Sequence, residues 1–207
     1  MTYVVDHPLA QARLTALRRE ETDAPTFRRT LRELGAILAV EVTRDLRLAR
    51  EAITTPLTRM DAPVLAGPVP CLVSVLRAGE ALLAGFLDVL AEAPVAHVGA
   101  YRDAKTLEAV EYYFKAPPDL NRRMAIVVDP MLATGGTAIA AVARVKKAGP
   151  LAVRYVSVLA APEGVQALMA AHPDVKLWTV GLDTGLDGHG YIVPGLGDAG
   201  DRAFGTQ

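Results

Sequence analysis

The residues best suited to chemistry lie in one segment, IVVDPMLATGGTA, at residues 126–138. An apolar run ends in a single carboxylate, Asp129, and a loop of small and hydroxyl-bearing residues follows before a helical pattern begins. Glycines let a backbone approach an anion closely, and a helix N-terminus carries roughly half a positive charge. The hydroxyls of Thr134 and Thr137 add further donors. The segment predicts a cradle for a monophosphate, with Asp129 placed to accept hydrogen bonds from a pair of sugar hydroxyls.

Two familiar phosphate-binding loops do not match this segment. No lysine follows the glycines as a P-loop requires, and the dinucleotide fingerprint G-x-G-x-x-G is absent. An ordinary strand-to-helix turn remains the alternative, because a Thr-Gly-Gly sequence alone is common in such turns. The preceding carboxylate and apolar run favour the phosphate site.

Two arginines follow other apolar runs. Arg77 lies in SVLRAGE and Arg102 follows HVGAY. Ligands of open α/β sheets bind at the carboxyl ends of the strands, so both side chains are candidates for contact with an anion. A guanidinium group holds two phosphate oxygens at once and stays charged at neutral pH. The alternative for Arg77 is a surface arginine, the commoner fate of this residue type.

The elements that must position these residues follow from the hydrophobic pattern. In residues 26–46, apolar side chains recur at helical spacing. From residue 69, short apolar runs alternate with helical segments. We predict strands at residues 70–76, 95–102, 124–129, 153–160 and 177–182, and helices at 80–90, 138–149 and 162–172. This alternation indicates an α/β fold with a mostly parallel sheet covered on both faces.

Two segments interrupt the alternation. Residues 103–119 are polar and aromatic, and we expect them to leave the sheet as a hairpin. This hairpin either folds over the site and excludes water, or stays exposed with its aromatic residues packed locally or against another subunit. Residues 188–207 contain too much glycine and proline for regular structure, so we predict an ordered loop that lines a site.

Composition limits the classes of protein that the chain can represent. The 207 residues are 51% hydrophobic and form one predicted domain, residues 1–207. The net charge of −1 gives no general attraction to nucleic acid or to an anionic membrane. The single cysteine, Cys71, excludes a disulfide framework and is expected to be a buried hydrophobic residue. With neither a signal peptide nor an apolar run that could cross a bilayer, a cytoplasmic protein is expected.

These residues carry a resemblance to a known family. VVDPMLATGGTA resembles the phosphoribosyl-diphosphate (PRPP) binding motif of type I phosphoribosyltransferases, in the form found in the uracil phosphoribosyltransferase family. Nearly the whole chain resembles this family in order and spacing, and DPMLATGG together with YIVPGLGDAGDRAFGT is highly specific. The other matching segments are HPLAQARLTALR, LRAG, YRDAKTLEAVEYYFK, KKAG, AAPEGVQAL and AHPDV. The resemblance implies the type I phosphoribosyltransferase fold, with a flap hairpin and a C-terminal base-binding loop region.

The resemblance also implies roles for individual residues. Arg77 and Arg102 would contact the diphosphate, and Asp198 would reach PRPP through its carboxylate and Mg²⁺, which makes these three the catalytic candidates. The rest of the implied PRPP site is Asp129, Pro130, Met131, Leu132, Ala133, Thr134, Gly135, Gly136 and Thr137. Uracil would contact Ile192, Gly197, Asp198 and Ala199, largely through their main-chain groups.

The implied reaction is uracil + PRPP → UMP + diphosphate, a step of pyrimidine salvage. Mg²⁺ is the implied cofactor, bound through PRPP, and no residue is assigned as its direct ligand. Family members are often homodimers or larger homo-oligomers, and some are activated by GTP. GTP is therefore a candidate effector, although no feature of the sequence assigns a site to it.

The sequence departs from the family pattern at four positions. Glu80 places a negative charge near the proposed diphosphate site unless its side chain points away. Ala109 and Glu111 replace prolines that would stiffen the flap, and Ala100 replaces a larger apolar residue.

Three other functions compete with the enzyme. The first is a regulator of RNA or transcription that binds PRPP or nucleotides on the same fold, which the absence of a basic stripe disfavours. The second is an enzyme for another base, and the third is a catalytically inactive subunit.

Overall fold

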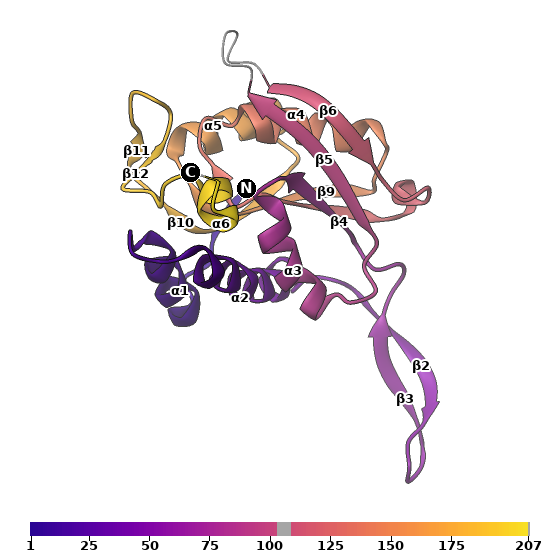
Figure 1. The fold of residues 1–207 in the computed structure, drawn as a ribbon. Helices are drawn as coiled ribbons and strands as arrows, with labels where there is room; N and C mark the ends of the chain where they lie inside the picture. Colours follow the sequence, from indigo (N-terminus) through magenta and orange to yellow (C-terminus); the bar gives the residue numbers. More distant parts are fainter. Residues whose placement is uncertain (103–108, 207) are drawn as a thin grey trace.

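A single mostly parallel sheet organises the chain (Figure 1). This computed structural model describes residues 1–102 and 109–206, and for residues 100–102 and 109–111 it describes the backbone only. The sheet order is β1-β10-β9-β7-β4-β5-β6, and the short β8 also pairs with β9. Its strands are β1 (Thr2–Val4), β4 (Cys71–Leu76), β5 (Val95–Arg102), β6 (Ala109–Lys115), β7 (Met124–Val128), β8 (Met131–Leu132), β9 (Ala152–Ala160) and β10 (Lys176–Leu182). All pairs are parallel except β5 with β6, which confirms the predicted fold class.

Helices cover both faces of this sheet, because its central strands are apolar on both sides. The strand β7 is buried from Ala125 to Val128, and β4 is buried from Cys71 to Val75. The apolar residues of α1, α2 and α3 form one core with the sheet, and those of α4 and α5 form a second core on the opposite face. These helices are α1 (Pro8–Arg18), α2 (Ala24–Val42), α3 (Gly79–Val89), α4 (Gly136–Lys147) and α5 (Pro162–Ala171).

The helix α2 begins and packs as its sequence predicts. Asp23 accepts a hydrogen bond from the Thr26 N–H at 2.9 Å, and proline occupies the first turn. The predicted apolar positions Phe27, Leu31, Leu34 and Leu38 are fully buried. No helix in the described part of the chain combines the length and the apolar character needed to cross a membrane.

Two glycines bring α2 and α3 into close contact. A Cβ atom at Gly35 would overlap the Leu82 carbonyl oxygen, and one at Gly85 would overlap the Arg32 carbonyl oxygen. The two backbones therefore approach more closely than larger residues would permit. Because α3 starts two residues after Arg77, this contact also positions the loop that carries Arg77.

The two segments that interrupt the predicted alternation both contain regular structure. The predicted excursion from the sheet is wrong for residues 109–115, because they form its edge strand β6, which pairs antiparallel with β5. Residues 103–108 lie outside the described part of the chain. The C-terminal segment contains β12 (Ile192–Val193), which pairs with β11 (Gly185–Leu186), and the helix α6 (Ala199–Phe204). Asp198 caps the start of α6 and Gly205 ends it at a φ of +65°, so the prediction of an entirely irregular segment was wrong.

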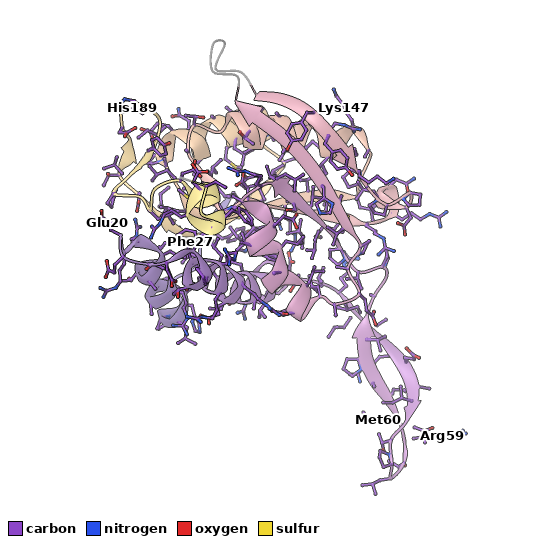
Figure 2. All side chains as sticks on the ribbon, in the orientation of Figure 1. Glu20, Phe27, Arg59, Met60, Lys147 and His189 are labelled. Atoms are coloured by element: carbon purple, nitrogen blue, oxygen red, sulfur yellow. The ribbon has the colours of Figure 1, made fainter. Side chains whose placement is uncertain are left out.

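A two-stranded arm projects from the body of the protein (Figures 1 and 2). It consists of β2 (Leu48–Thr54) and β3 (Arg59–Leu65), which pair with each other and with no other described strand. The connecting turn is closed by Thr55, whose N–H donates to the Thr58 carbonyl at 2.9 Å. The hydrophobic pattern did not predict this arm, because its side chains lie almost entirely in solvent and bury no regular face.

Candidate functional site

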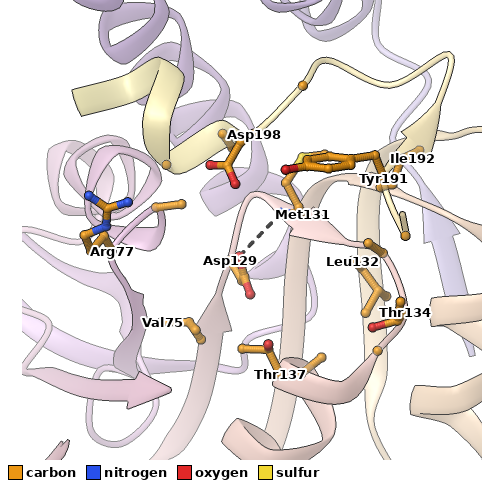
Figure 3. Close-up of a pocket in the computed structure, with 18 of the residues that line it drawn as sticks. Val75, Arg77, Asp129, Met131, Leu132, Thr134, Thr137, Tyr191, Ile192 and Asp198 are labelled. Atoms are coloured by element: carbon orange, nitrogen blue, oxygen red, sulfur yellow. Dashed lines mark hydrogen bonds between the residues drawn. The ribbon is translucent and has the colours of Figure 1, made fainter. Parts of the chain in front are cut away.

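A cavity of about 510 Å³ lies at the carboxyl ends of β4 and β7 (Figure 3). Three segments that are far apart in the sequence line it: residues 75–78, residues 129–138, and the C-terminal segment between residues 189 and 200. The strand ends provide the floor, and the C-terminal segment lies across from the 129–138 loop. This is the place where open α/β sheets bind ligands.

Most of the residues predicted to form the site line this one cavity. They are Arg77, Asp129, Met131, Leu132, Ala133, Thr134, Gly135, Thr137, Ile192, Gly197, Asp198 and Ala199. Two predicted residues do not line it. Pro130 is buried, and its carbonyl oxygen accepts hydrogen bonds from the N–H groups of Val158 and Leu159, while Gly136 is the exposed first residue of α4. The Arg102 side chain lies outside the described residues, although its backbone ends β5.

The loop between β7 and α4 has the geometry of an anion cradle. Gly135 has a φ of +88°, a left-handed conformation that favours glycine. No side chain in the described residues caps α4, so the N–H groups of its first turn are available as donors. The hydroxyl-bearing residues Thr134 and Thr137 both line the cavity beside them.

Gly164 in α5 supports this loop from below and was missed by the sequence analysis. A Cβ atom at Gly164 would overlap the carbonyl oxygen of Ala133 and lie 2.8 Å from that of Leu132. The helix can therefore pack directly against the loop only because residue 164 has no side chain. The available signal was a glycine in the first turn of a predicted helix, where it lowers helix propensity.

Asp129 is the buried acceptor of the cavity. The Tyr155 hydroxyl donates to Oδ2 at 3.2 Å. The Met131 N–H donates to Oδ1 at 3.4 Å (Figure 3). Burial raises the pKa of the Asp129 carboxyl from 3.8 to about 7, although these two hydrogen bonds act in the opposite direction. An acceptor held in this way is suited to hydroxyl donors of a ligand. Tyr155 is fully buried, and nothing in its local sequence indicated this role.

Arg77 connects the β4–α3 junction to the C-terminal helix. Its Nη2 donates to Asp201 Oδ1 at 3.0 Å, and its Nη1 donates to the Thr206 hydroxyl at 3.3 Å. Hydrogen bonds from Thr206 and Arg77 lower the pKa of the Asp201 carboxyl, so it stays ionised at neutral pH. Asp201 in α6 and Thr206 after it therefore hold the guanidinium group beside the cavity, a role that their local sequence did not predict.

Asp198 has a structural role as well as a place in the cavity lining. Its Oδ1 accepts a hydrogen bond from the Asp201 N–H at 2.9 Å and so caps α6. The predicted uracil contacts Gly197 and Ala199 flank it, and the third, Ile192, is buried nearby on β12. His189 also lines the cavity, and its main-chain N–H donates to Asp187 Oδ1 at 2.8 Å.

Two further residues raised by the sequence analysis lie away from the cavity. Glu80 does not line it, and its Oε1 lies 3.2 Å from Nε2 of His97 on β5. Its negative charge is therefore directed away from the proposed diphosphate site. Cys71 is fully buried, as expected, and burial raises the pKa of its thiol to about 11. The side chains of Ala100, Ala109 and Glu111 lie outside the described residues.

The described residues fit a Mg²⁺ ion that takes most of its ligands from a substrate. Within residues 1–102 and 109–206, no three His, Cys, Asp or Glu side chains are grouped to hold a metal ion on their own. Two carboxylates, Asp129 and Asp198, line the cavity. Mg²⁺ commonly binds one or two carboxylates together with substrate phosphates and water, so this donor set is sufficient.

Comparisons with known proteins agree with this geometry. A family model described as uracil phosphoribosyltransferase matches residues 4–206. Proteins named uracil phosphoribosyltransferase from Rhizobium leguminosarum and Brucella anthropi are 54% and 55% identical to this chain, over 99% of it and 98% of their own length. The solved structure of the AQ2163 protein from Aquifex aeolicus is 36% identical, with a TM-score of 0.94 over 99% of this chain and 98% of that chain.

A more distant structure shares the fold alone. Adenine phosphoribosyl transferase from Trypanosoma brucei is 14% identical, with a TM-score of 0.59 over 91% of this chain and 86% of that chain. The predicted sheet and its flanking helices are thus those of type I phosphoribosyltransferases.

Proposed function

The chain belongs to the uracil phosphoribosyltransferase family, and on this basis we propose that it transfers the 5-phosphoribosyl group of PRPP to N1 of uracil. The products are UMP and diphosphate. The observation that carries this function is the single cavity formed by the 129–138 loop, the β4–α3 junction and the C-terminal segment. PRPP would bind to the 129–138 loop and the β4–α3 junction, and the base would bind to the C-terminal segment. The cavity can therefore hold both substrates next to each other.

The 129–138 loop is suited to the ribose-5-phosphate part of PRPP. The free N–H groups at the start of α4 and the hydroxyls of Thr134 and Thr137 would donate to the phosphate oxygens. Asp129 would accept hydrogen bonds from the ribose hydroxyls. This carboxylate is only 9% exposed, so the bound hydroxyls would restore polar contacts that burial removed.

The C-terminal segment is suited to uracil. The base presents an acceptor at O4 and a donor at N3, which one backbone N–H and one backbone C=O can satisfy. Gly197 and Ala199 provide main-chain groups at the cavity wall, and the buried Ile192 provides an apolar surface. Cytosine reverses both polarities and would leave these groups unpaired, a mismatch that can cost several orders of magnitude in discrimination.

The chemical step requires stabilisation of a leaving diphosphate. The bond between C1 and the diphosphate oxygen lengthens ahead of attack, and N1 of uracil adds to the opposite face of C1. The proton on N1 is lost in this step, with the departing diphosphate as its acceptor. Arg77, and by resemblance Arg102, would neutralise the charge that develops on the diphosphate. Mg²⁺, when bound through PRPP oxygens with Asp198 or Asp129 beside it, adds further charge neutralisation. Positioning and electrostatics account for the catalysis, and no nucleophilic side chain is needed.

Diphosphate release tests this function directly. PRPP and Mg²⁺ are supplied with uracil, cytosine, hypoxanthine or no base, and released diphosphate is measured. We expect release with uracil only. Release with hypoxanthine would show that the base is a purine and not uracil. PRPP binding without release in any arm would contradict the proposed enzymatic activity. The competing function, an RNA or transcription regulator, has no support from the relatives compared above.

We also propose that the chain is a homodimer or a larger homo-oligomer that covers the arm. Five apolar residues of the arm and its turn are exposed, with Leu57 95% and Leu48 65% accessible. The other three are Ile53, Met60 and Leu65. An isolated two-stranded ribbon is marginally stable in water, and exposed apolar groups of this kind mark contacts between proteins.

Sedimentation velocity tests the assembly. We expect the wild type to sediment as a dimer or larger species, and the double variant Leu57→Ser, Met60→Ser to shift toward the monomer. The matched control, Leu151→Ser, alters an apolar residue that is 72% exposed outside the arm and should not change sedimentation. A monomeric wild type at micromolar concentration would contradict the proposal. Activation by GTP and a cytoplasmic location stay predictions from the sequence.

A further inference from the structure

Two arginines bind the backbone of residues 189–200 from outside the cavity. We call these residues the uracil segment, because the proposed function places the base against them. Arg18 at the end of α1 donates to the Gly195 carbonyl at 2.8 Å, and Arg202 in α6 donates to the Leu196 carbonyl at 2.7 Å. Neither arginine lines the cavity. Two successive carbonyl groups of the segment are therefore bound by guanidinium groups that do not belong to the cavity wall.

Arg202 makes the more extensive set of contacts. Beyond Leu196, its guanidinium group donates to the carbonyl oxygens of Leu17, Arg19 and Thr22, at 2.6, 2.5 and 3.4 Å. The group also lies over the Phe27 ring, 4.7 Å from its centroid. All of these partners belong to α1, α2 or their connection, so Arg202 ties the uracil segment to the N-terminal helices.

Arg18, together with the carboxylate of Asp183, holds Gly195, the residue before Leu196. It makes a two-pronged ion pair with Asp183, at 2.8 and 2.6 Å, and Asp183 Oδ2 accepts the Gly195 N–H at 2.8 Å. Both backbone polar groups of Gly195 are thus held by the same pair of side chains. Gly195 has a φ of +67°, and a Cβ atom there would overlap the Ile192 carbonyl oxygen.

The contact between Arg202 and the Leu196 carbonyl also determines where the next N–H group, that of Gly197, points. The Leu196–Gly197 bond is trans, so the Gly197 N–H points opposite to the Leu196 carbonyl. Since Arg202 binds that carbonyl, the N–H points away from Arg202. Gly197 lines the cavity, and among the described residues its N–H has no hydrogen-bond acceptor.

We propose that Arg202 is a positioning residue for the base, which aims the Gly197 N–H into the cavity by binding the Leu196 carbonyl, and that Arg18 supports the same segment at Gly195. The inference rests on the proposed function and assigns a physical origin to its base specificity. The Gly197 N–H is then the donor that pairs with O4 of uracil, and the amino group at the same position of cytosine cannot accept its hydrogen bond. Without Arg202 the peptide is free to rotate, and its carbonyl can face the amino group of cytosine instead.

Lysine cannot replace arginine in this role. A guanidinium group presents five N–H donors in a rigid plane, whereas an ammonium group is a point charge on a flexible stem. Arg202 serves four carbonyl acceptors at once. Arg202→Lys therefore keeps the charge and most of the stem but loses the fixed direction.

Steady-state kinetics with Arg202→Lys test the inference. We expect the KM for uracil to rise at least about tenfold, the preference for uracil over cytosine to fall, and kcat and the KM for PRPP to change less than about threefold. The matched control is Arg28→Lys, since Arg28 donates to the Ala203 carbonyl of the same helix at 2.6 Å but does not touch residues 195–197. The control should keep the wild-type KM for uracil.

Two results would overturn the inference, and a second variant decides if Arg202→Lys does not fold. An unchanged KM for uracil in Arg202→Lys, with only a lower melting temperature, shows a structural role and overturns the positioning role while the proposed function stands. A wild type that is inactive with uracil overturns both. If Arg202→Lys does not fold, Arg18→Lys decides, because a severalfold rise in its KM for uracil supports the inference and an unchanged value contradicts it.

Discussion

Asp129→Asn is expected to lower the rate of phosphoribosyl transfer by about a hundredfold or more and, at pH 8, to raise the melting temperature. The carboxyl is buried and has a pKa of about 7, against 3.8 in an unfolded chain. At pH 8 the folded protein therefore contains a buried charge with only two hydrogen bonds, from Tyr155 and Met131. An asparagine has nearly the same shape and no charge, so it removes this cost.

The sign of the pH dependence follows from the raised pKa. Between about pH 4 and pH 7 the folded state binds a proton that the unfolded state has released, so stability falls as the pH rises through this range. Above pH 7 the loss is complete, and it amounts to at most on the order of 4 kcal/mol. We expect the wild type and Asp129→Asn to have similar melting temperatures near pH 4 and to diverge up to about pH 7.

The same group sets the pH dependence of PRPP binding. An ionised carboxylate accepts hydroxyl hydrogen bonds more strongly than a protonated one. The KM for PRPP in the wild type should therefore rise as the pH falls below about 7. In the asparagine variant, kcat/KM should be lower than in the wild type by about a hundredfold or more at every pH.

Asp119→Asn is the matched control for Asp129→Asn. A hydrogen bond from Arg123 lowers the pKa of Asp119, so its substitution should leave activity unchanged and slightly lower the melting temperature at pH 8. Two results would contradict the assignment of Asp129. One is wild-type turnover in the asparagine variant, and the other is a melting temperature at pH 8 below that of the wild type.

Arg77→Ala is expected to lower kcat by about a hundred- to a thousandfold while the protein folds normally. The side chain is 57% exposed, and its two partners, Asp201 and Thr206, are themselves at the surface. Exposed ion pairs of this kind contribute little to stability. The catalytic effect is large because the charge of the leaving diphosphate would lose a guanidinium partner in the transition state.

Two companion variants separate charge from geometry at this position. Arg77→Lys retains the charge without the planar fork, and we expect it to recover only part of the lost rate. Arg32→Ala removes an arginine from an exposed ion pair with Asp88. Neither residue lines the cavity, so this variant should keep full activity. Single-turnover rates and circular dichroism are the measurements. A rate near that of the wild type in Arg77→Ala would remove this residue from the catalytic group.

Much of the site could be predicted from local patterns. The structure contains the predicted order of an apolar strand that ends at Asp129, a glycine loop and a helix. Each of these three features is determined by residues that are neighbours in the sequence. The same is true of Arg77, which follows an apolar run and lies at the end of β4. Residues of this kind are predictable because the ends of parallel strands meet at one edge of a sheet.

Other features depend on contacts between distant segments. The helix α6 has only six residues and is too short to be stable alone, so its formation depends on the Asp198 cap and on contacts of Arg202 and Arg28. The arm was not predictable either, because no periodic burial marks it.

The fold class, the family and the chemical character of the loop follow from residue types at short spacing, so the amino-acid sequence alone predicts them. The side chains that surround the loop depend on contacts that form only in the folded protein. Tyr155 beneath Asp129, Gly164 beneath the loop and Arg202 behind the uracil segment come from other elements. Their roles arise when the folded backbone brings distant carbonyl, hydroxyl and guanidinium groups within hydrogen-bonding distance, and no local pattern encodes that distance.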